Sequence, residues 1–310
     1  MLRVQAVRYG GGDGPIVRMV SSVVAAAVVA RADRPGLTVT LALGDGGGPG
    51  GPSEVLGRGA VSELTEIAAA GGVALEHVAF GANLGHGGGQ NRLFSQLDGT
   101  PGEPDVVVIC NPDTYLGPTC LAFLLACLED RSVGIAEARQ LPLEHPKPFD
   151  LATGDTPWAS GCLMALPAKL YRSLGGFEEA FFLHGDDVDL SWRVRLSGHR
   201  VVHVPAASVF HDKRPTDSGF PPPTPEEEYQ AVLARFLLAH RAERRDVIDW
   251  WLEWSDRHAS VRQAEATAAF RQLVDSGDLP TTYRQALGVD ATAVNEVAAF
   301  HGGEYAAHRF

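Results

Sequence analysis

Three aspartates crowd into four positions near the middle of the chain. Asp186, Asp187 and Asp189 follow two adjacent phenylalanines and begin a helix-like pattern over 187–196. Like charges this close repel one another, so a protein keeps such a cluster where a helix N-terminus, a cation or a proton transfer makes use of it. The cluster therefore predicts either helix-capping acids or chemistry in a cleft.

Helix geometry divides the three carboxylates into different roles. Asp186 and Asp189 share a face at i, i+3, whereas Asp187 is turned from Asp186 by about 100°. An acid of the first turn, Asp186 or Asp187, can point into a cleft and act as a general base toward a hydroxyl. Asp189 is expected to bond the backbone or an arginine, Arg193 or Arg195. The alternative is a plain helix start with favourable first-turn acids, and on these residues alone it is the preferred interpretation.

A second candidate site comes from Asp113 and His211. Asn111-Pro112-Asp113 follows the apolar run 105–110, which reads as a strand buried on both faces. A carboxylate at such a strand end can hold a divalent cation against a diphosphate, but Asn-Pro-Asp-Thr is equally good turn chemistry. His211 follows another apolar strand, where a histidine is more often packed or solvated. Paired with Asp113, it would complete a site suited to Mn²⁺.

Alternating strands and helices must position these residues. Strands are expected over 2–7, 37–43, 73–80 and 105–110, with helices over 15–31 and 53–70 and another beginning near Asn91. This alternation predicts an α/β fold with a parallel sheet and right-handed crossovers. Ligands bind such sheets at the carboxyl ends of the strands. Every unusual loop lies at such an end: Tyr9-Gly10, Asp45, Asn83 to Asn91, and Asn111 to Asp113.

The second half of the chain is less regular and ends in helices. The expected elements are a helix over 120–128, a strand over 132–137, an irregular loop over 140–157, a strand over 158–166, a helix over 167–174 and a strand over 199–204. A Pro-rich stretch over 215–225 marks a boundary, which predicts domains over 1–215 and 216–310. Helices are expected over 229–243, 245–258 and 261–275. Their tryptophans indicate packing on the main domain, with an oligomer interface as the alternative.

Composition limits the partners and the compartment. The 310 residues carry a net charge of -12, which argues against nucleic acid as a partner because that requires a basic face. The four cysteines lie in or beside apolar runs and are expected to be free thiols of a reducing cytoplasm. No signal peptide is evident, and the apolar runs fall short of the ~20 residues that span a bilayer. We expect a cytoplasmic protein without a transmembrane segment, with peripheral contact at the inner face of the membrane left open.

The order of the motifs is more specific than any one of them. Asn83-Leu84-Gly85, Asn111-Pro112-Asp113, Trp158-Ala159-Ser160-Gly161, Gly175-Gly176-Phe177, Asp186-Asp187 and His211 follow one another along the chain. This run resembles the family 2 inverting glycosyltransferases, most of all the bacterial rhamnosyl- and galactofuranosyltransferase branch. The resemblance is strong over 81–211 and weak over 3–80. It implies a GT-A fold, with a Rossmann-like and mostly parallel sheet, here followed by a helical C-terminal extension.

The resemblance also implies roles for individual residues. Asp113 corresponds to the metal ligand that anchors the nucleotide diphosphate, His211 to a histidine that completes the Mn²⁺ or Mg²⁺ site, and Asp187 to the general base that deprotonates the acceptor hydroxyl. The nucleotide sugar would also contact Tyr9, Asp45, Asn83, Asn91 and Asn111. Trp158 and Asp186 would lie near the acceptor. The implied donor is dTDP-rhamnose or a UDP-sugar, and the implied acceptor is a glycan, a lipid-linked sugar or a natural product, as in cell-wall or polysaccharide biosynthesis.

The chain departs from the family pattern in three places. The first loop reads Arg8-Tyr9-Gly10 instead of Thr-Tyr-Asn, the second strand ends in Gly44-Asp45-Gly46, and the acid pair is Asp186-Asp187 instead of Glu-Asp. The first two departures affect nucleotide choice more than catalysis. The rival enzyme class is a sugar nucleotidyltransferase, which would usually carry a Lys- or Arg-bearing glycine loop. A non-catalytic nucleotide-sugar-binding or scaffold protein on the same fold is the other alternative.

Overall fold

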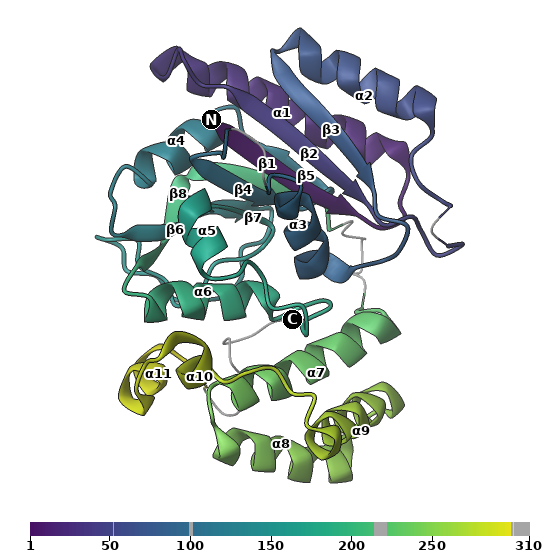
Figure 1. The fold of residues 1–310 in the computed structure, drawn as a ribbon, viewed down its shortest axis with the longest axis vertical. Coiled ribbons are helices and arrows are strands. Elements are labelled where there is room, and N and C mark those ends of the chain that lie inside the picture. Colours follow the sequence, from purple (N-terminus) through teal and green to yellow (C-terminus); the bar gives the residue numbers. More distant parts are fainter. Residues whose placement is uncertain (52, 99–101, 214–221, 299, 301–310) are drawn as a thin grey trace.

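The computed structural model describes residues 1–51, 53–98, 102–213, 222–298 and 300, as one α/β layer structure with a helical bundle beneath it (Figure 1). One eight-stranded sheet runs in the order β3-β2-β1-β4-β7-β6-β8-β5. The strands are β1 (Leu2–Arg8), β2 (Val39–Asp45), β3 (Val73–Ala79), β4 (Val106–Cys110), β5 (Thr114–Leu116), β6 (Val133–Leu141), β7 (Leu163–Pro167) and β8 (Arg200–His211).

The sheet is mostly parallel, as expected, with antiparallel strands in its second half. β3, β2, β1 and β4 are parallel neighbours, and β8 is parallel to β6. β7 is inserted antiparallel between β4 and β6, and β5 pairs antiparallel with β8 at the edge. Because β1, β2 and β4 run in the same direction, their carboxyl ends deliver the loops after Arg8, Asp45 and Cys110 to one edge of the sheet.

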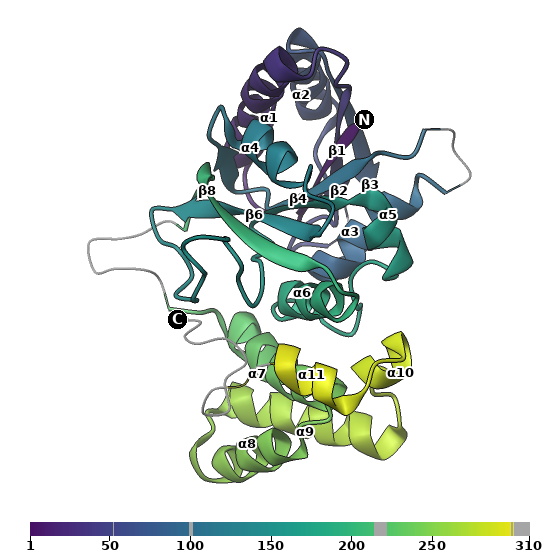
Figure 2. The ribbon, with the colours of Figure 1, turned by 90° about the vertical axis from the view of Figure 1, so that its left-hand side faces the viewer.

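Helices cover both faces of the sheet (Figure 2). One face carries α1, α2 and α4 and the other carries α3, α5 and α6. The bounds are α1 (Asp13–Asp33), α2 (Arg58–Ala70), α3 (Gly85–Ser95), α4 (Cys120–Cys127), α5 (Ala168–Ser173) and α6 (Asp186–Leu196). Successive side chains of β4 point to opposite faces of the sheet: Val108 packs on the face with α1, and Val107 and Ile109 pack on the face with α3. Both faces are covered by helices, so every residue of the strand is apolar.

Among the described residues after 221, the chain forms five helices, which lie below α6 in both ribbon views. They are α7 (Pro225–Arg241), α8 (Arg245–His258), α9 (Val261–Ser276), α10 (Tyr283–Leu287) and α11 (Ala291–Val297). Val188 and Trp192 of α6 share an apolar cluster with Leu237 of α7, Tyr283 of α10 and Val294 of α11. The helix that carries the three aspartates is therefore buried between the sheet domain and the extension.

Several local expectations need correction. α3 begins at Gly85 instead of near Asn91, so the glycine run forms the first turns of a helix. A side chain at Gly87 would lie 2.8 Å from Cβ of Phe177, so close packing explains the glycine there. Residues 158–162 precede β7 without being strand, while β8 extends to His211. The sequence did not predict the short elements β5, α10 and α11. The predicted boundary between domains, at residues 215 and 216, lies outside the described residues.

α1 is more apolar than the sequence runs suggested. It is one helix of 21 residues with a window of mean hydropathy 1.6, long and apolar enough to cross a membrane by length and composition. In this fold, seven of its residues, among them Met19, Val23 and Ala27, are buried in the core on one face of the sheet. Three of the four cysteines are buried free thiols, as expected, and Cys127 is partly exposed.

Candidate active site

The N-terminus of α6 lies at the centre of the candidate site. Its backbone enters through two consecutive residues of positive φ, His184 (φ 68°) and Gly185 (φ 76°), which turn the chain sharply into the helix. The first-turn acids are all buried, with exposed fractions of 3% for Asp186, 7% for Asp187 and 0% for Asp189. Buried carboxylates need hydrogen-bond partners, and each of the three has different ones.

Asp187 is anchored by two backbone N–H groups. Its Oδ2 accepts from the amide of Gly161 at 3.1 Å, and its Oδ1 accepts from the amide of Val188 at 2.9 Å. Glycine at position 161 leaves room for the ring of His86, because a Cβ there would lie 3.0 Å from its Cε1 and 3.6 Å from Cβ of Asp187. These two backbone bonds fix the orientation of the carboxylate.

Asp186 forms an ion pair with a histidine from another element. Its Oδ2 lies 2.5 Å from Nδ1 of His86, at the start of α3. Burial lowers the pKa of His86, but the charge and hydrogen bond of Asp186, together with the charge of Asp187, outweigh it and raise the pKa above its usual value. The sequence-based prediction did not include His86, although it is the titratable side chain within the run Gly85–Gly89.

Asp189 has a structural role, as expected. Its Oδ2 accepts from Nε of Arg193 at 2.8 Å, one helical turn along α6. Its Oδ1 accepts from the hydroxyl of Tyr283 at 3.0 Å and lies 3.1 Å from Nη1 of Arg241. Arg241 also bonds Glu178 at 2.8 Å. The third aspartate therefore ties α6 to α7 and α10 of the extension.

Asp113 and His211 come together at the other end of the site. Antiparallel pairing of β5 with β8 places Thr114 opposite His211, and Oδ1 of Asp113 lies 3.4 Å from Nε2 of His211. Nδ1 of His211 lies 3.3 Å from Oε1 of Gln140. With Nδ1–H donated to Gln140, the Nε2 lone pair faces the carboxylate. The turn interpretation also holds, because the hydroxyl and amide of Thr114 both donate to the carbonyl of Asn111.

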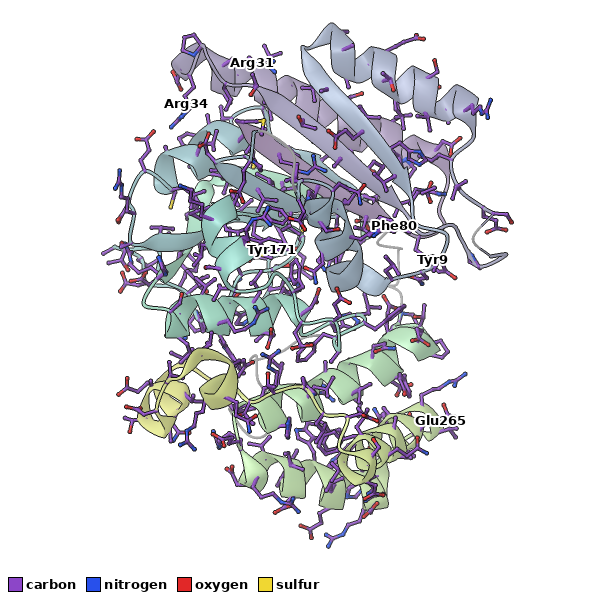
Figure 3. All side chains as sticks on the ribbon, viewed as in Figure 1. Tyr9, Arg31, Arg34, Phe80, Tyr171 and Glu265 are labelled. Carbon is purple, nitrogen blue, oxygen red and sulfur yellow. The ribbon has the colours of Figure 1, made fainter. Side chains whose placement is uncertain are left out.

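The loops after β1 and β2 are locked together by an ion pair. Asp45 is fully buried, and its carboxylate accepts from Nη1 of Arg8 at 2.7 Å, from the amides of Gly47 and Leu56 at 3.0 and 2.8 Å, and lies 3.2 Å from Nε2 of His77. Tyr9 is 49% exposed at the end of β1, on the same edge of the sheet as Phe80, which follows β3 (Figure 3).

The comparisons with known proteins agree with this architecture. No family model matches the chain. It is 27% identical to the N-acetylglucosaminyl-diphospho-decaprenol L-rhamnosyltransferase of Mycobacterium tuberculosis, covering 62% of this chain and 78% of that one. It is 23% identical to the rhamnosyltransferase WbbL of Escherichia coli, over 36% of this chain and 53% of the relative. The matched enzymes are glycosyltransferases.

Solved structures establish the fold. The structure of S. aureus TarS superposes with a TM-score of 0.56 at 11% identity, and covers 96% of this chain. GalNAc-T7, solved with UDP, GalNAc and Mn²⁺, gives 0.56 at 12% identity over 95% of this chain. The present chain spans a little over half the length of each of these structures. This protein is a glycosyltransferase with the GT-A fold.

Two residues of the glycosyltransferase that were expected at the ligand are held inside the fold. Asn91 donates from Nδ2 to the carbonyl of Phe177 at 2.9 Å, and its Oδ1 accepts from the hydroxyl of Tyr171 and the amide of Phe177. Trp158 is 2% exposed, with Nζ of Lys147 4.2 Å from its ring centroid. The structure gives both residues packing roles, so contact with the nucleotide sugar or the acceptor stays a prediction for each.

The remaining residues predicted to contact the nucleotide sugar differ in how exposed their side chains are. Asn83 is exposed, and its Oδ1 accepts from the amide of Gly85 at the start of α3. Asn111 is partly exposed in the turn that presents Asp113. Asp45 lies at the predicted strand end, but its buried oxygens hold Arg8 and two backbone amides. In the described conformation Asp45 holds together the loops that follow β1 and β2. A direct contact between Asp45 and the nucleoside would require one of these bonds to break.

Asp45 gives this glycosyltransferase a specific acid sensitivity. Burial raises the pKa of Asp45, but hydrogen bonds from His77, Leu56 and Gly47 and the charge of Arg8 lower it from 3.8 to about 2. A lowered folded-state pKa stabilises the fold above pH 4, and this stabilisation is lost as the pH falls from about 4 to 2. The shift corresponds to roughly 2 kcal/mol. Urea unfolding at pH 5 and pH 2.5 should show that loss in wild type and a smaller pH dependence in Asp45→Asn; equal pH dependence would contradict the assignment.

Proposed function

We propose that this glycosyltransferase transfers a sugar from a nucleotide diphosphate to an acceptor hydroxyl with inversion, with Asp187 as the general base. The observation that carries the proposal is the fixed carboxylate of Asp187 at the start of α6, held by the amides of Gly161 and Val188. A base in an inverting transfer must be oriented before the acceptor arrives, and the two backbone donors supply that orientation.

The donor proposed first is dTDP-rhamnose, with UDP-sugars as the alternative. Two relatives are named rhamnosyltransferases, and one name specifies an N-acetylglucosaminyl-diphospho-decaprenol acceptor. A lipid-linked diphospho-sugar is therefore the first acceptor class to test, ahead of free glycans and natural products. Such an acceptor supports work at the cytoplasmic face of a membrane and a role in cell-wall polysaccharide synthesis. The sheet domain would bind both substrates, and the extension over 216–310 would support α6.

The transfer is a single displacement. The carboxylate of Asp187 takes the proton of the acceptor hydroxyl as its oxygen attacks the anomeric carbon from the face opposite the leaving group. The bond between that carbon and the diphosphate oxygen breaks, and its electron pair leaves with the nucleoside diphosphate. Inversion follows because one bond forms on one face while the other breaks on the opposite face.

Asp113 and His211 are the residues that would hold a divalent cation. Two ligands at adjacent positions of an octahedral ion with bonds near 2.1 Å lie about 3 Å apart. The 3.4 Å between Oδ1 of Asp113 and Nε2 of His211 fits that spacing, and Gln140 orients the imidazole as metal-ligating histidines require. Over the described ranges no group of three His, Cys, Asp or Glu side chains is arranged to hold a metal ion, so the diphosphate and water would supply the remaining ligands. Bound Mn²⁺ or Mg²⁺ would offset the negative charge of the leaving diphosphate.

Asp113→Ala tests the metal proposal directly. The variant should lose most of the Mn²⁺-dependent affinity for the nucleotide, about tenfold or more, because one of two protein ligands is removed. Calorimetric titration of dTDP and UDP with and without Mn²⁺ measures this. Asp105→Ala is the matched control, since Asp105 is an exposed acid at the opposite end of β4. Unchanged metal-dependent affinity in Asp113→Ala would contradict the assignment.

A donor screen tests the reaction class. Wild-type protein with Mn²⁺ or Mg²⁺ and a short-chain polyprenyl diphospho-N-acetylglucosamine should release dTDP from dTDP-rhamnose. Release of UDP from a UDP-sugar would change the donor but keep the reaction. Pyrophosphate release from a nucleoside triphosphate would favour a nucleotidyltransferase. Absence of nucleotide binding and of release with every donor would favour the scaffold alternative.

A further inference from the structure

The backbone segment over 158–161 is held by side chains instead of by a strand ladder. Residues 158–162 form neither helix nor strand before β7 begins. Three successive amides of this segment donate to side-chain oxygens of α6 and β6: Ala159 to Oγ of Ser191 at 2.9 Å, Ser160 to Oε1 of Glu137 at 2.7 Å, and Gly161 to Oδ2 of Asp187 at 3.1 Å. The direction of each N–H group in the segment therefore depends on the side chain that accepts from it.

The Gly161 amide joins this segment to the proposed base. Of the two backbone donors to Asp187, Val188 is the next residue of the same helix, whereas Gly161 comes from a different part of the chain. The direction of the Gly161 N–H relative to the preceding peptide group is set by the φ and ψ angles of Ser160. The amide of that preceding peptide group is the one that Glu137 holds. Glu137 and Asp187 thus bind adjacent amides of one short segment.

Glu137 is a buried carboxylate with a buried ammonium group as its partner. The side chain of Lys147 is 2% exposed and that of Glu137 is 0% exposed. Nζ of Lys147 donates to Oε1 of Glu137 at 2.5 Å, to Oε2 at 2.6 Å and to the carbonyl of Trp158 at 2.7 Å, while Nδ1 of His203 lies 3.4 Å from Oε2. Burial raises the pKa of Glu137, but the charge of Lys147 and the hydrogen bonds to the carboxylate outweigh it and lower the pKa below its usual value.

Stability alone does not account for this ion pair. Replacing a buried ion pair by apolar side chains of similar volume is often neutral or stabilising, because both charges lose their hydration on burial. An apolar pair at positions 137 and 147 would, however, leave the Ser160 amide without the acceptor that Glu137 provides. Lys147 binds both carboxylate oxygens and so holds the plane of that acceptor in one orientation. The pair supplies a fixed acceptor that a hydrophobic core would lack.

We propose that Glu137 is a positioning residue for the glycosyl transfer: oriented by Lys147, it holds the Ser160 amide and so directs the Gly161 N–H at the carboxylate of Asp187. This inference rests on the proposed function of Asp187. Glu137 lies on β6 and Lys147 in the loop that follows it, so both act on the site from outside α6.

Two double variants that both lack the ion pair isolate the acceptor. Glu137→Gln/Lys147→Met keeps an oxygen for the Ser160 amide, whereas Glu137→Leu/Lys147→Met does not. Neither variant leaves a buried unpaired charge, so both should fold. We expect kcat of Glu137→Leu/Lys147→Met to be about 10–100-fold below that of Glu137→Gln/Lys147→Met, because a small misplacement of a reacting group slows the chemical step. The donor KM of the two variants should agree within about threefold.

Arg3→Met is the matched control for a loss of stability. Arg3 is 3% exposed, pairs with Glu76 at 2.7 Å and donates to the carbonyl of Leu93 at 3.2 Å. It lies near the amino end of β1, away from the strand ends that form the candidate site. Arg3→Met should lower the free energy of unfolding and leave kcat within about twofold of wild type. A fall in its kcat as large as that of Glu137→Leu/Lys147→Met would overturn the positioning role, because lost stability would then explain both.

The amide resonance of Gly161 gives a readout that is independent of turnover. Cell-free labelling with carbon-13 in the serine carbonyl and nitrogen-15 in glycine restricts the spectrum to the few Ser-Gly pairs of the chain. The Gly161 signal is the one that moves most in Asp187→Asn, which removes the charge of its acceptor. In Glu137→Leu/Lys147→Met it should move in the same direction. In Glu137→Gln/Lys147→Met it should stay near its wild-type position.

The outcomes separate this inference from the proposed function. If wild type transfers sugar and the two double variants have equal kcat, the positioning role is wrong while the glycosyl transfer stands. An unchanged Gly161 resonance in Glu137→Leu/Lys147→Met overturns the role regardless of turnover. If wild type turns over no donor but the resonance moves as expected, the proposed function fails, and the link from Glu137 to the Gly161 amide remains.

Discussion

Replacing Asp187 by asparagine should lower kcat by about two to four orders of magnitude while the nucleotide sugar still binds. The side chain keeps its size and one oxygen that can accept from the Gly161 or Val188 amide. It loses the negative charge that would take the acceptor proton. Donor affinity should change little, because the proposed diphosphate contacts belong to Asp113 and His211 at the ends of other strands.

Steady-state transfer and calorimetric donor binding measure the two effects separately. Asp246→Asn removes a first-turn helix aspartate on the exposed side of the extension and should leave both quantities at wild-type values. If Asp187→Asn turns over at the wild-type rate, Asp187 is not the base. If it loses donor binding together with turnover, its effect is on the shape of the site and the proton-transfer role is not supported.

Asp189→Ala should destabilise the fold by about 3–5 kcal/mol. Asp189 is fully buried and faces Arg193, Arg241 and the hydroxyl of Tyr283. Its removal leaves two buried guanidinium groups without their shared counter-charge. The change also cuts the polar link between α6 and the helices α7 and α10 of the extension.

Urea unfolding at neutral pH measures this loss. The matched control is Asp249→Ala, which breaks an exposed pair with Arg245 at the same i, i+4 spacing and should cost less than about 0.5 kcal/mol. Similar losses for the two variants would show that burial of the Asp189 network adds no stability. A loss confined to Asp189→Ala would support the extension as part of the structure that holds α6 in place.

The sheet was predictable because its signals are local. The apolar run before Asn111 predicts a strand buried on both faces, and β4 is such a strand. The alternation of the first four strands with helices predicts the parallel half of the sheet. β5 escaped notice because three residues, Thr114–Leu116, carry no periodicity, and it is formed by pairing with β8. That same pairing brings Asp113 next to His211, which the sequence suggested by chemistry and the family resemblance suggested by position.

The hydrogen-bond partners in the site were not predictable to the same degree. The contact of His86 with Asp186 joins two helices that the sheet brings together, and no local pattern encodes it. Arg8 looked like a departure that affects nucleotide choice, and the structure shows that it neutralises the buried Asp45. Of the partners expected for Asp189, the backbone, Arg193 or Arg195, the structure shows Arg193, an i, i+4 pair that is readable from sequence. Its further partners, Tyr283 and Arg241, belong to the extension and required the fold.

The most direct test of the account is the stereochemistry of the product. Wild-type protein should convert dTDP-rhamnose and a short-chain polyprenyl diphospho-N-acetylglucosamine into a disaccharide-bearing lipid, in the presence of Mn²⁺ or Mg²⁺. The proton–carbon coupling at the new anomeric centre should report the configuration opposite to that of the donor. Asp187→Asn should give little or no product under the same conditions. A product with retained configuration, or equal product from the variant, would contradict a single displacement with Asp187 as the base.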